Sequence, residues 1–388
     1  MSFDFTSIID RRQVTTEKWV HYDDDVLPLW VADMDLASPD VIQQALQVRT
    51  HHPIYGYAHP PASLNTALTT WSQTHYDWTI DTQWLHWLPG VVPALHVVAQ
   101  ALCAPDEALM TLTPIYPPFL SVGTHTGRET VTASLAEPSE QNGGRWTLDI
   151  DALEAAITPN TKVLLFCHPH NPTGRVFTQQ ELEALAAFVE RHDLWVCSDE
   201  LHCDLILNGE QHRPLAKAVP QIADRIITLW AASKTFNVAG LTCACAVISN
   251  PVLRARFAQG CAGWMPSHNV MGMVATEAAY TQGEPWRQAL ITHLQACVRL
   301  IETYVARWPG VQFIPPEATF LGWLDVRKTD LSASPQQFLL EKARVALSDG
   351  ADFGNPGFVR INFGTTKAQL ENALQRLDPW LSAKPSKR

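Results

Sequence analysis

The run from Lys162 to Cys167, apolar throughout after its first residue, most restricts the fold of this chain. It lacks the polar alternation of a half-exposed strand, which is typical of a strand buried on both faces of a parallel sheet. Downstream, Thr178 and Glu181 have the spacing of a capping box at the start of a helix, and the strand-like run Leu194–Cys197 follows. This strand, helix, strand order predicts an α/β fold with a parallel sheet.

Other short apolar runs continue this alternation of strands and helices along the chain. A long segment from about 284 to 307 repeats with a helical period, and the last part of the chain has the pattern of a smaller α/β layer. The further predicted strands are Trp84–Leu88, Ala108–Leu112, Ile226–Leu229, Cys243–Ser249, Phe320–Leu324 and Phe358–Phe363.

Composition narrows the class of protein. The chain has 388 residues and a net charge of -11, and its one basic run is the short segment Lys384–Arg388, so we expect no nucleic-acid partner. No apolar stretch is long enough to span a bilayer and no targeting segment is recognisable, so we expect no membrane association and a cytoplasmic location. Eight cysteines lie without Cys-x-x-Cys spacing, and we expect no metal site.

Polar residues follow several of the predicted strands. In open parallel α/β sheets, ligands bind beyond the carboxyl ends of the strands. Tyr116, Asn171, Asp199 and Lys234 each stand at or just after such an end, so we expect them to converge on one site. The acids Asp33 and Asp35 follow another apolar run; they could be catalytic, although a polar loop is the commoner explanation for such a pair.

Lys234 lies among small, apolar and hydroxyl residues, directly after the strand-like run Ile226–Leu229. Few neighbouring side chains could solvate its charge, so we expect a lowered amine pKa. A neutral amine is the nucleophile that Schiff-base chemistry with a carbonyl or a pyridoxal aldehyde requires. An ordinary surface lysine after a strand is the alternative, which the rest of the chain makes the weaker one.

The expected constellation describes a pyridoxal-phosphate site. Asp199 would keep the ring nitrogen protonated, Asn171 would donate to the phenolic oxygen, and Tyr116 would stack on the ring. The turn at Gly90, followed by Val91 and Val92 at a predicted helix start, would offer backbone N–H groups to the phosphate. This turn lacks the Gly-Lys-Ser/Thr of a nucleotide-binding loop.

The motifs Asn171-Pro172-Thr173-Gly174, Ser198-Asp199-Glu200, Ser233-Lys234 and Phe358–Asn362 resemble the signatures of fold-type I, class I/II aminotransferases in order and spacing. The resemblance covers nearly the whole chain. It implies the pyridoxal-phosphate-dependent transferase fold type I, with a mainly parallel seven-stranded sheet flanked by helices. It also implies a large cofactor-binding domain over residues 46–284 and a small α/β domain built from 1–45 and 285–388.

Within this family, the runs Leu29–Asp35, Asp199–His202 and Ser233–Asn237 resemble the MalY/PatB cystathionine β-lyase branch. This resemblance implies a homodimer with shared active sites. It also implies that Tyr57 reaches the phosphate of the partner subunit's cofactor and that Arg360 holds the substrate α-carboxylate. An arginine suits that role because its fork binds a carboxylate with two hydrogen bonds; a salt bridge to an acid between the domains is the alternative.

The chain departs from the family pattern in two places. Ala231 stands where relatives often have a serine for the phosphate, and Thr242 and Cys243 stand where related aminotransferases have an arginine. The phosphate should therefore depend on backbone donors. Our candidates are Ser233, Val91, Val92 and Tyr57.

The residue three positions after Asp199 bears on the reaction. Many aminotransferases have a tyrosine there that bonds the phenolic oxygen, whereas this chain has His202, which favours a carbon–sulfur β-lyase. Such an enzyme would convert L-cystathionine or a related cysteine thioether to a thiol, pyruvate and ammonia, with Lys234 as the base. The alternatives are an aminotransferase acting on an L-amino acid and a catalytically silent regulator with the same fold.

Overall fold

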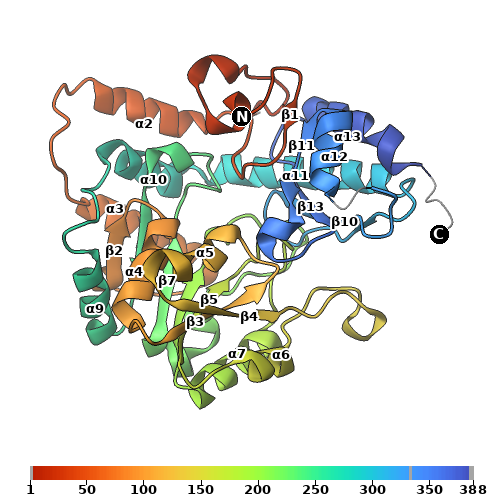
Figure 1. Cartoon of the computed structure of the whole chain (residues 1–388). Coiled ribbons are helices and arrows are strands. Elements are labelled where there is room, and N and C mark those ends of the chain that lie inside the picture. Colours follow the sequence, from red (N-terminus) through yellow and green to blue (C-terminus); the bar gives the residue numbers. More distant parts are fainter. Residues whose placement is uncertain (1–2, 332–333, 384–388) are drawn as a thin grey trace.

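The computed structural model describes residues 3–331 and 334–383, so the basic run Lys384–Arg388 lies outside the described residues. Figure 1 shows the chain with its elements labelled. Over the part described, no helix is both long and apolar enough to cross a bilayer.

The helices alternate with the strands along most of the chain. Their bounds are α1 Glu17–Val20, α2 Asp40–Thr50, α3 Ala62–Tyr76, α4 Val91–Leu102, α5 Pro117–Thr126, α6 Ile150–Ala156, α7 Gln179–Arg191, α8 Leu215–Ala218, α9 Pro251–Cys261, α10 Val270–Gln282, α11 Glu284–Val305, α12 Pro335–Ala343 and α13 Lys367–Leu381. The short 3-10 helices are η1 Arg12–Val14, η2 Thr82–Trp84, η3 Glu140–Asn142, η4 Pro220–Arg225, η5 Ala239–Leu241 and η6 Gly350–Phe353.

The strands form a large sheet, a smaller sheet and a separate pair. Their bounds are β1 Leu27–Pro28, β2 Leu85–Leu88, β3 Ala108–Thr113, β4 Glu129–Ser134, β5 Thr161–Cys167, β6 Trp195–Asp199, β7 Ile226–Trp230, β8 Ala244–Val247, β9 Gln312–Phe313, β10 Leu321–Asp325, β11 Val345–Ala346, β12 Ser348–Asp349 and β13 Phe358–Asn362. Each predicted strand is present, with ends that differ by one or two residues. The capping box of Thr178 and Glu181 at the start of α7 is also confirmed.

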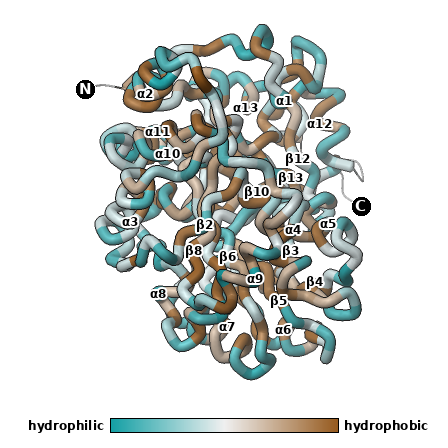
Figure 2. The backbone as a smooth tube through the Cα atoms, turned by 90° about the vertical axis from the view of Figure 1, so that its left-hand side faces the viewer, coloured by the Kyte–Doolittle hydropathy of each residue, from teal (hydrophilic) through white to brown (hydrophobic). Residues whose placement is uncertain are grey.

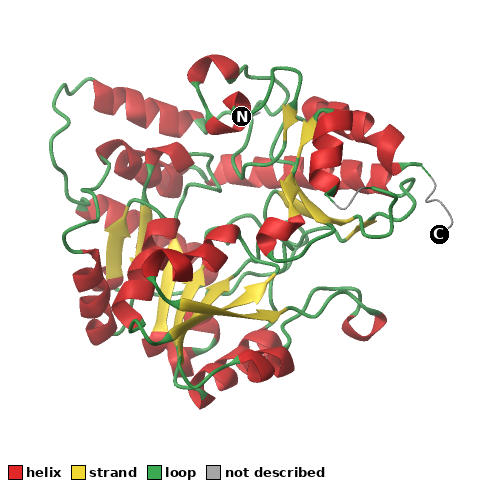
Figure 3. Ribbon diagram, viewed as in Figure 1, coloured by secondary structure: helices red, strands yellow, loops and turns green. Residues whose placement is uncertain are grey.

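The large sheet has seven strands in the order β2-β8-β7-β6-β5-β3-β4. Strand β8 runs antiparallel to both of its neighbours, and the remaining pairs are parallel. Helices lie on either side of this sheet (Figure 3). The expected mainly parallel seven-stranded sheet flanked by helices is therefore confirmed.

Strand β5 is buried on both of its faces, as its apolar run predicts. Val163 and Leu165 face one hydrophobic core, which α4 and α9 help to form, whereas Leu164 and Phe166 face a second core formed with α7. Alternating side chains of one strand point to opposite faces of a sheet, so each face needs apolar residues. Residues of high hydropathy are accordingly frequent along the chain in the region of β5, β6 and β8 (Figure 2).

The smaller sheet has the order β12-β13-β10-β9, with its strand pairs antiparallel. Beside it, β1 from the start of the chain pairs in parallel with β11 from the end. In Figure 1 the red N-terminal segment accordingly lies next to the blue C-terminal elements. The two ends of the chain thus build one region together.

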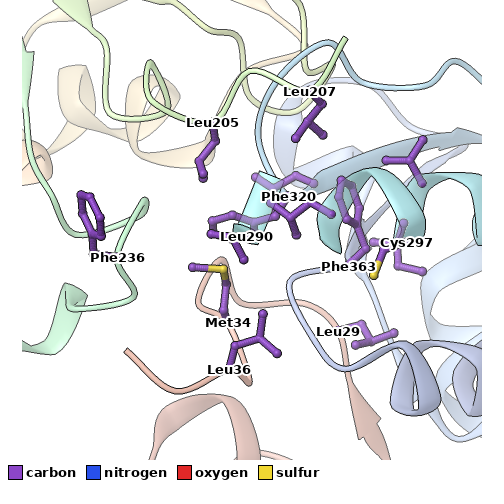
Figure 4. Close-up of a cluster of buried hydrophobic side chains, with 14 of the residues drawn as sticks. Leu29, Met34, Leu36, Leu205, Leu207, Phe236, Leu290, Cys297, Phe320 and Phe363 are labelled. Atoms are coloured by element: carbon purple, nitrogen blue, oxygen red, sulfur yellow. The ribbon is translucent and has the colours of Figure 1, made fainter. Parts of the chain in front are cut away.

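A hydrophobic cluster joins the N-terminal segment to both sheets. Met34 and Leu36 lie between Phe236, which follows β7 of the large sheet, and Phe320 and Phe363, which directly flank β10 and β13 of the smaller sheet (Figure 4). These five side chains are 4% exposed or less. Burial of this apolar surface holds the N-terminal segment between the two sheets.

The acids Asp33 and Asp35 take part in a network of ion pairs rather than standing in a free polar loop. Asp35 lies 2.8 Å from Lys18 Nζ and 2.8 Å from Arg11 Nη1, and it accepts a hydrogen bond from the indole of Trp19 at 2.8 Å. Asp33 pairs with the same arginine at 2.6 Å. Since Lys18 is 1% exposed and Asp35 is 3% exposed, their charges are compensated within this network rather than by water.

We predict that Asp35→Asn destabilises the protein by about 3 kcal/mol, because it removes the nearer carboxylate of a buried ion pair and leaves Lys18 with the longer contact to Asp33 at 3.5 Å. Unfolding in urea and the melting temperature both measure this loss. Asp24→Asn is the matched control in the same segment, since Asp24 is exposed and lies 4.0 Å from Arg12. Equal stability of the two variants would contradict the structural role of Asp35.

Candidate functional site

Two adjoining cavities meet at Lys234, beyond the carboxyl ends of the parallel strands. The inner cavity has a volume of about 200 Å³ and the outer cavity about 520 Å³, and Ala32, Tyr116 and Lys234 line both. The predicted site residues that line the inner cavity are Val91, Val92, Tyr116, Asn171, Asp199, His202, Ser233 and Lys234. The expected convergence of strand-end residues is therefore confirmed.

Lys234 follows β7 and reaches the point where the two cavities join. Its Nζ donates a hydrogen bond to the carbonyl oxygen of Ala32 at 2.7 Å. Burial lowers the pKa of Lys234 to about 8, against the opposing charge of Asp33. The lowered amine pKa expected from the sequence is therefore confirmed.

Asp199 is the last residue of β6 and lies on the floor of the inner cavity. It is 7% exposed, and its carboxylate accepts a hydrogen bond from the backbone N–H of Leu201 at 3.1 Å. Burial raises the pKa of Asp199 to about 7, while this hydrogen bond and the charge of Lys234 act in the opposite direction. A cationic group in the cavity would restore full ionisation of the carboxylate.

Asn171 and Arg360 form a direct link between the inner and outer cavities. Arg360 Nη1 donates to the Oδ1 of Asn171 at 3.0 Å, so the NH₂ of this amide is the group left to donate into the inner cavity. The Nη2 of Arg360 donates to the carbonyl oxygen of Trp30 at 2.8 Å and to the hydroxyl of Ser348 at 3.2 Å.

Arg360 lines the outer cavity and has spare hydrogen-bonding capacity. It is 4% exposed, its buried Nε has no hydrogen-bond partner, and burial lowers its pKa to about 10. Among the residues described, no carboxylate lies within ion-pair distance of it, so the alternative of a salt bridge between domains finds no partner. The neighbours Val359 and Ile361 face the hydrophobic core, as strand alternation predicts.

His202 is a neutral ring beside the inner cavity. It is 4% exposed, and burial together with the charges of Lys234 and Arg360 lowers its pKa to about 3. Its Nδ1 is buried without a hydrogen-bond partner. A buried nitrogen of this kind needs a partner in the functional state of the site.

The anion end of the inner cavity contains backbone and hydroxyl groups rather than an arginine. Val91 and Val92 form the first turn of α4, whose unpaired N–H groups and dipole favour an anion, and Ser233 lies beside them. Lys234 is the one basic side chain among the residues that line this cavity in the described part of the chain. Thr242, at the departure noted above, instead accepts a hydrogen bond from Asn269 at 3.2 Å.

Tyr57 is the predicted site residue that the fold does not bring to Lys234. It lies in the long loop between α2 and α3, which extends from the left edge of the molecule in Figure 1, and its side chain is 96% exposed. It lines a separate cavity with His268 and Asn269.

Two kinds of group at this site were not predicted from the sequence. The carbonyl oxygens of Trp30 and Ala32 receive hydrogen bonds from Arg360 and Lys234, and backbone oxygens carry no residue-type signal. The acids of the outer cavity were also missed, because they come from distant parts of the chain. They are Glu17, Asp349 and Asp352.

The chain is similar over nearly its whole length to known proteins. Cystathionine beta-lyase PatB of Bacillus subtilis (strain 168) is 35% identical over 364 residues, covering 92% of this chain and 93% of that protein. The crystal structure of OvoB matches with a TM-score of 0.94 at 41% identity, covering 98% of this chain and 100% of that one. Cystalysin from Treponema denticola, whose crystal structure contains a pyridoxal 5'-phosphate cofactor, matches with a TM-score of 0.92 at 31% identity, covering 98% and 99%.

These neighbours confirm the expected transferase fold type I. The sequence profile described as aminotransferase class I and II matches residues 24–377, which is most of the chain. The chain therefore belongs to the aminotransferase class I and II family.

Proposed function

We propose that this protein is a pyridoxal-phosphate-dependent carbon–sulfur β-lyase that acts on L-cystathionine or a related cysteine thioether. The observation that carries the proposal is the meeting of Lys234, Asp199 and Asn171 in one cavity, with the pKa of Lys234 lowered to about 8. The similarity to Cystathionine beta-lyase PatB supports the same reaction.

The inner cavity fits pyridoxal phosphate by the chemistry of its donors. Asp199 offers a carboxylate for a protonated ring nitrogen, the NH₂ of Asn171 and the unpartnered Nδ1 of His202 offer polar contacts for the ring's oxygen side, and the start of α4 with Ser233 offers donors for the phosphate. Tyr116 lines the same cavity and would cover the ring face. When bound, pyridoxal phosphate supplies an aldehyde that joins amines and a ring that accepts the electron pair left at Cα.

Lys234 moves the proton in this scheme. Its amine is substantially neutral near its pKa of about 8, so it can take the Cα proton of the bound amino acid. The pair of electrons left at Cα then allows the Cβ–S bond to break and the thiolate to leave, and water releases the remaining three carbons as pyruvate with ammonia. The thiolate takes a proton to become the thiol product.

Arg360 would orient the substrate. Its unpartnered Nε and its position on the wall of the outer cavity suit a carboxylate, which would accept a charge-assisted hydrogen bond from Nε. Because Arg360 also holds Asn171, the bound carboxylate would be placed at a set position relative to the inner cavity.

The lyase reaction is favoured over transamination by His202. The neutral ring stands where many aminotransferases have a tyrosine, and its pKa of about 3 keeps it uncharged throughout the working pH range. A pyruvate assay with L-cystathionine, with and without a keto-acid acceptor, tests the proposal. Pyruvate release without an acceptor supports the lyase, whereas turnover only with an acceptor would make the protein a transaminase.

We also propose a homodimer in which Tyr57 reaches the partner subunit's phosphate. Its 96% exposure and the nearby exposed Ile54 and Tyr55 support this assignment. Light scattering during gel filtration tests the dimer.

The large domain that we propose comprises residues 46–284, and the small domain combines residues 1–45 with 285–388. The pairing of β1 with β11 and the start of α11 at Glu284 support this division. The proposed location is the cytoplasm, since all eight cysteines are free thiols.

We predict that Lys234→Ala lowers kcat/KM for thioether cleavage by about two to four orders of magnitude, the usual contribution of a positioned base. Lys162→Ala, which removes a half-buried lysine at the far end of β5, is the control and should keep full activity. Borohydride reduction of the holoenzyme followed by peptide mapping gives an independent result. A label on any lysine other than Lys234 would contradict the assignment.

We predict that Asp199→Asn slows exchange of the substrate Cα proton in D₂O while the melting temperature stays close to that of the wild type. An amide cannot compensate a protonated ring nitrogen by charge, so the ring becomes a poorer electron acceptor. Proton exchange is followed by NMR. Wild-type exchange in this variant would reassign Asp199 to capping the turn at Leu201.

We predict that Arg360→Lys lowers kcat/KM roughly 10- to 150-fold, a loss of about 1.5–3 kcal/mol in transition-state binding, because a point charge replaces the guanidinium whose Nε would donate to the carboxylate. The control is Arg344→Lys, which changes a surface arginine paired with Asp23 and Asp25. Kinetics are measured beside the melting temperature. A lowered melting temperature with wild-type kcat/KM would give Arg360 a purely structural role.

A further inference from the structure

We propose that the outer cavity selects thioethers whose sulfur-linked leaving group carries a positive charge and no carboxylate. This inference rests on the proposed lyase function and names the class of substrate. It comes from the distribution of charge along the cavity, which has cations at its inner end and acids at its mouth.

The inner end of the outer cavity is prepared for the common part of any amino-acid substrate. Arg360 is 4% exposed and its Nε is buried without a partner, so it has capacity for a carboxylate oxygen. Lys234 lies at the same end. A substrate whose α-carboxylate and α-amine occupy these positions must extend its leaving group toward the mouth of the cavity.

Three carboxylates line the part of the cavity that the leaving group would enter. Glu17 comes from α1, Asp349 from the end of β12, and Asp352 from η6. Asp349 accepts a hydrogen bond from the N–H of Ala351 at 3.0 Å, which occupies one of its oxygens. In the described part of the chain none of these carboxylates has a lysine or arginine within ion-pair distance, so all three are open to a cationic ligand.

Aromatic rings add to the preference for a cation. Tyr22 and Trp30 line the same cavity, and their ring centroids are 5.8 Å apart in an edge-to-face arrangement. The face of such a ring attracts an ammonium or guanidinium group. The neutral amide of Gln336, which also lines this cavity, can hydrogen-bond to a cation or to an anion.

Among the described residues of this chain, the lining of the outer cavity offers no counterpart for a carboxylate on the leaving group. Over the described residues, the basic side chains that line the outer cavity are Lys234 and Arg360, and both are already assigned to the common part of the substrate. A carboxylate on the leaving group would therefore face three acids. L-cystathionine has both an ammonium and a carboxylate there, so a thioether with the ammonium alone should be the better substrate.

The test compares three thioethers of similar length with the holoenzyme at neutral pH. They are S-(2-aminoethyl)-L-cysteine, S-propyl-L-cysteine and S-(2-carboxyethyl)-L-cysteine. We expect kcat/KM for the aminoethyl compound to exceed that of the propyl compound about tenfold, since each of the three carboxylates, which are exposed or half-buried, contributes roughly a factor of two. The carboxyethyl compound should be the poorest, and the preference should shrink as salt is added.

The variants Glu17→Gln and Asp352→Asn locate the cause of the preference. Each should lower the ratio of aminoethyl to propyl kcat/KM about twofold, and the double variant about fourfold, if the contributions add. Asp151→Asn is the matched control, because Asp151 is exposed on α6 and lies outside the cavity. Its ratio should equal that of the wild type.

The outcomes separate this inference from the function on which it rests. Equal or better cleavage of the propyl or carboxyethyl compound would overturn the charge selection and leave the lyase intact. A ratio unchanged in both cavity variants would likewise overturn it. Failure to release pyruvate from all three compounds and from L-cystathionine would instead overturn the proposed function.

Discussion

The geometry of the site depends on the backbone of residues 30–36, which two asparagines hold from opposite sides. Asn237 Nδ2 donates to the carbonyl oxygens of Met34 and Leu36, each at 2.8 Å, and Asn362 Nδ2 donates to that of Asp33 at 2.6 Å. Asn237 lies three residues after Lys234 and Asn362 lies two after Arg360. The segment therefore ties the cofactor side to the substrate side, and its own carbonyl oxygens accept hydrogen bonds from both basic residues.

Ionisable side chains of the site are buried without an ion-pair partner among the described residues, so the site is suited to a charged ligand. The same desolvation lowers the pKa of Lys234 to about 8 and of His202 to about 3, and raises that of Asp199 to about 7, because it always opposes the charged form. By contrast, the buried charges of Lys18 and Asp35 are paired with each other. Ligand binding costs a site with unpaired buried groups less desolvation free energy than it would cost a surface site, since the groups are already desolvated and held in place.

Much of the fold and of the inner cavity was predictable, because it follows from local patterns. The apolar run of β5 identified a strand buried on both faces, and the rule that ligands lie beyond strand ends brought Asn171, Asp199 and Lys234 together. The acids of the outer cavity were not predictable, since Glu17 and Asp352 come from opposite ends of the chain and lie near one another only in the folded protein, where β1 pairs with β11. Asp33 and Asp35 were ambiguous for the same reason, because Arg11 and Lys18 are adjacent to them only in the folded chain.

The link between Arg360 and Asn171 gives the two cavities a common element. The guanidinium that suits a substrate carboxylate also holds the oxygen of the amide that would donate to the cofactor ring. A carboxylate that binds to Arg360 through Nε would leave Nη1 on Asn171, because the two nitrogens lie on different sides of the fork. Substrate binding would then preserve the hydrogen bond that orients the amide of Asn171. Recognition of the amino acid and positioning of the ring would then be parts of one hydrogen-bonded arrangement, and the acids at the mouth would be left to distinguish one thioether from another.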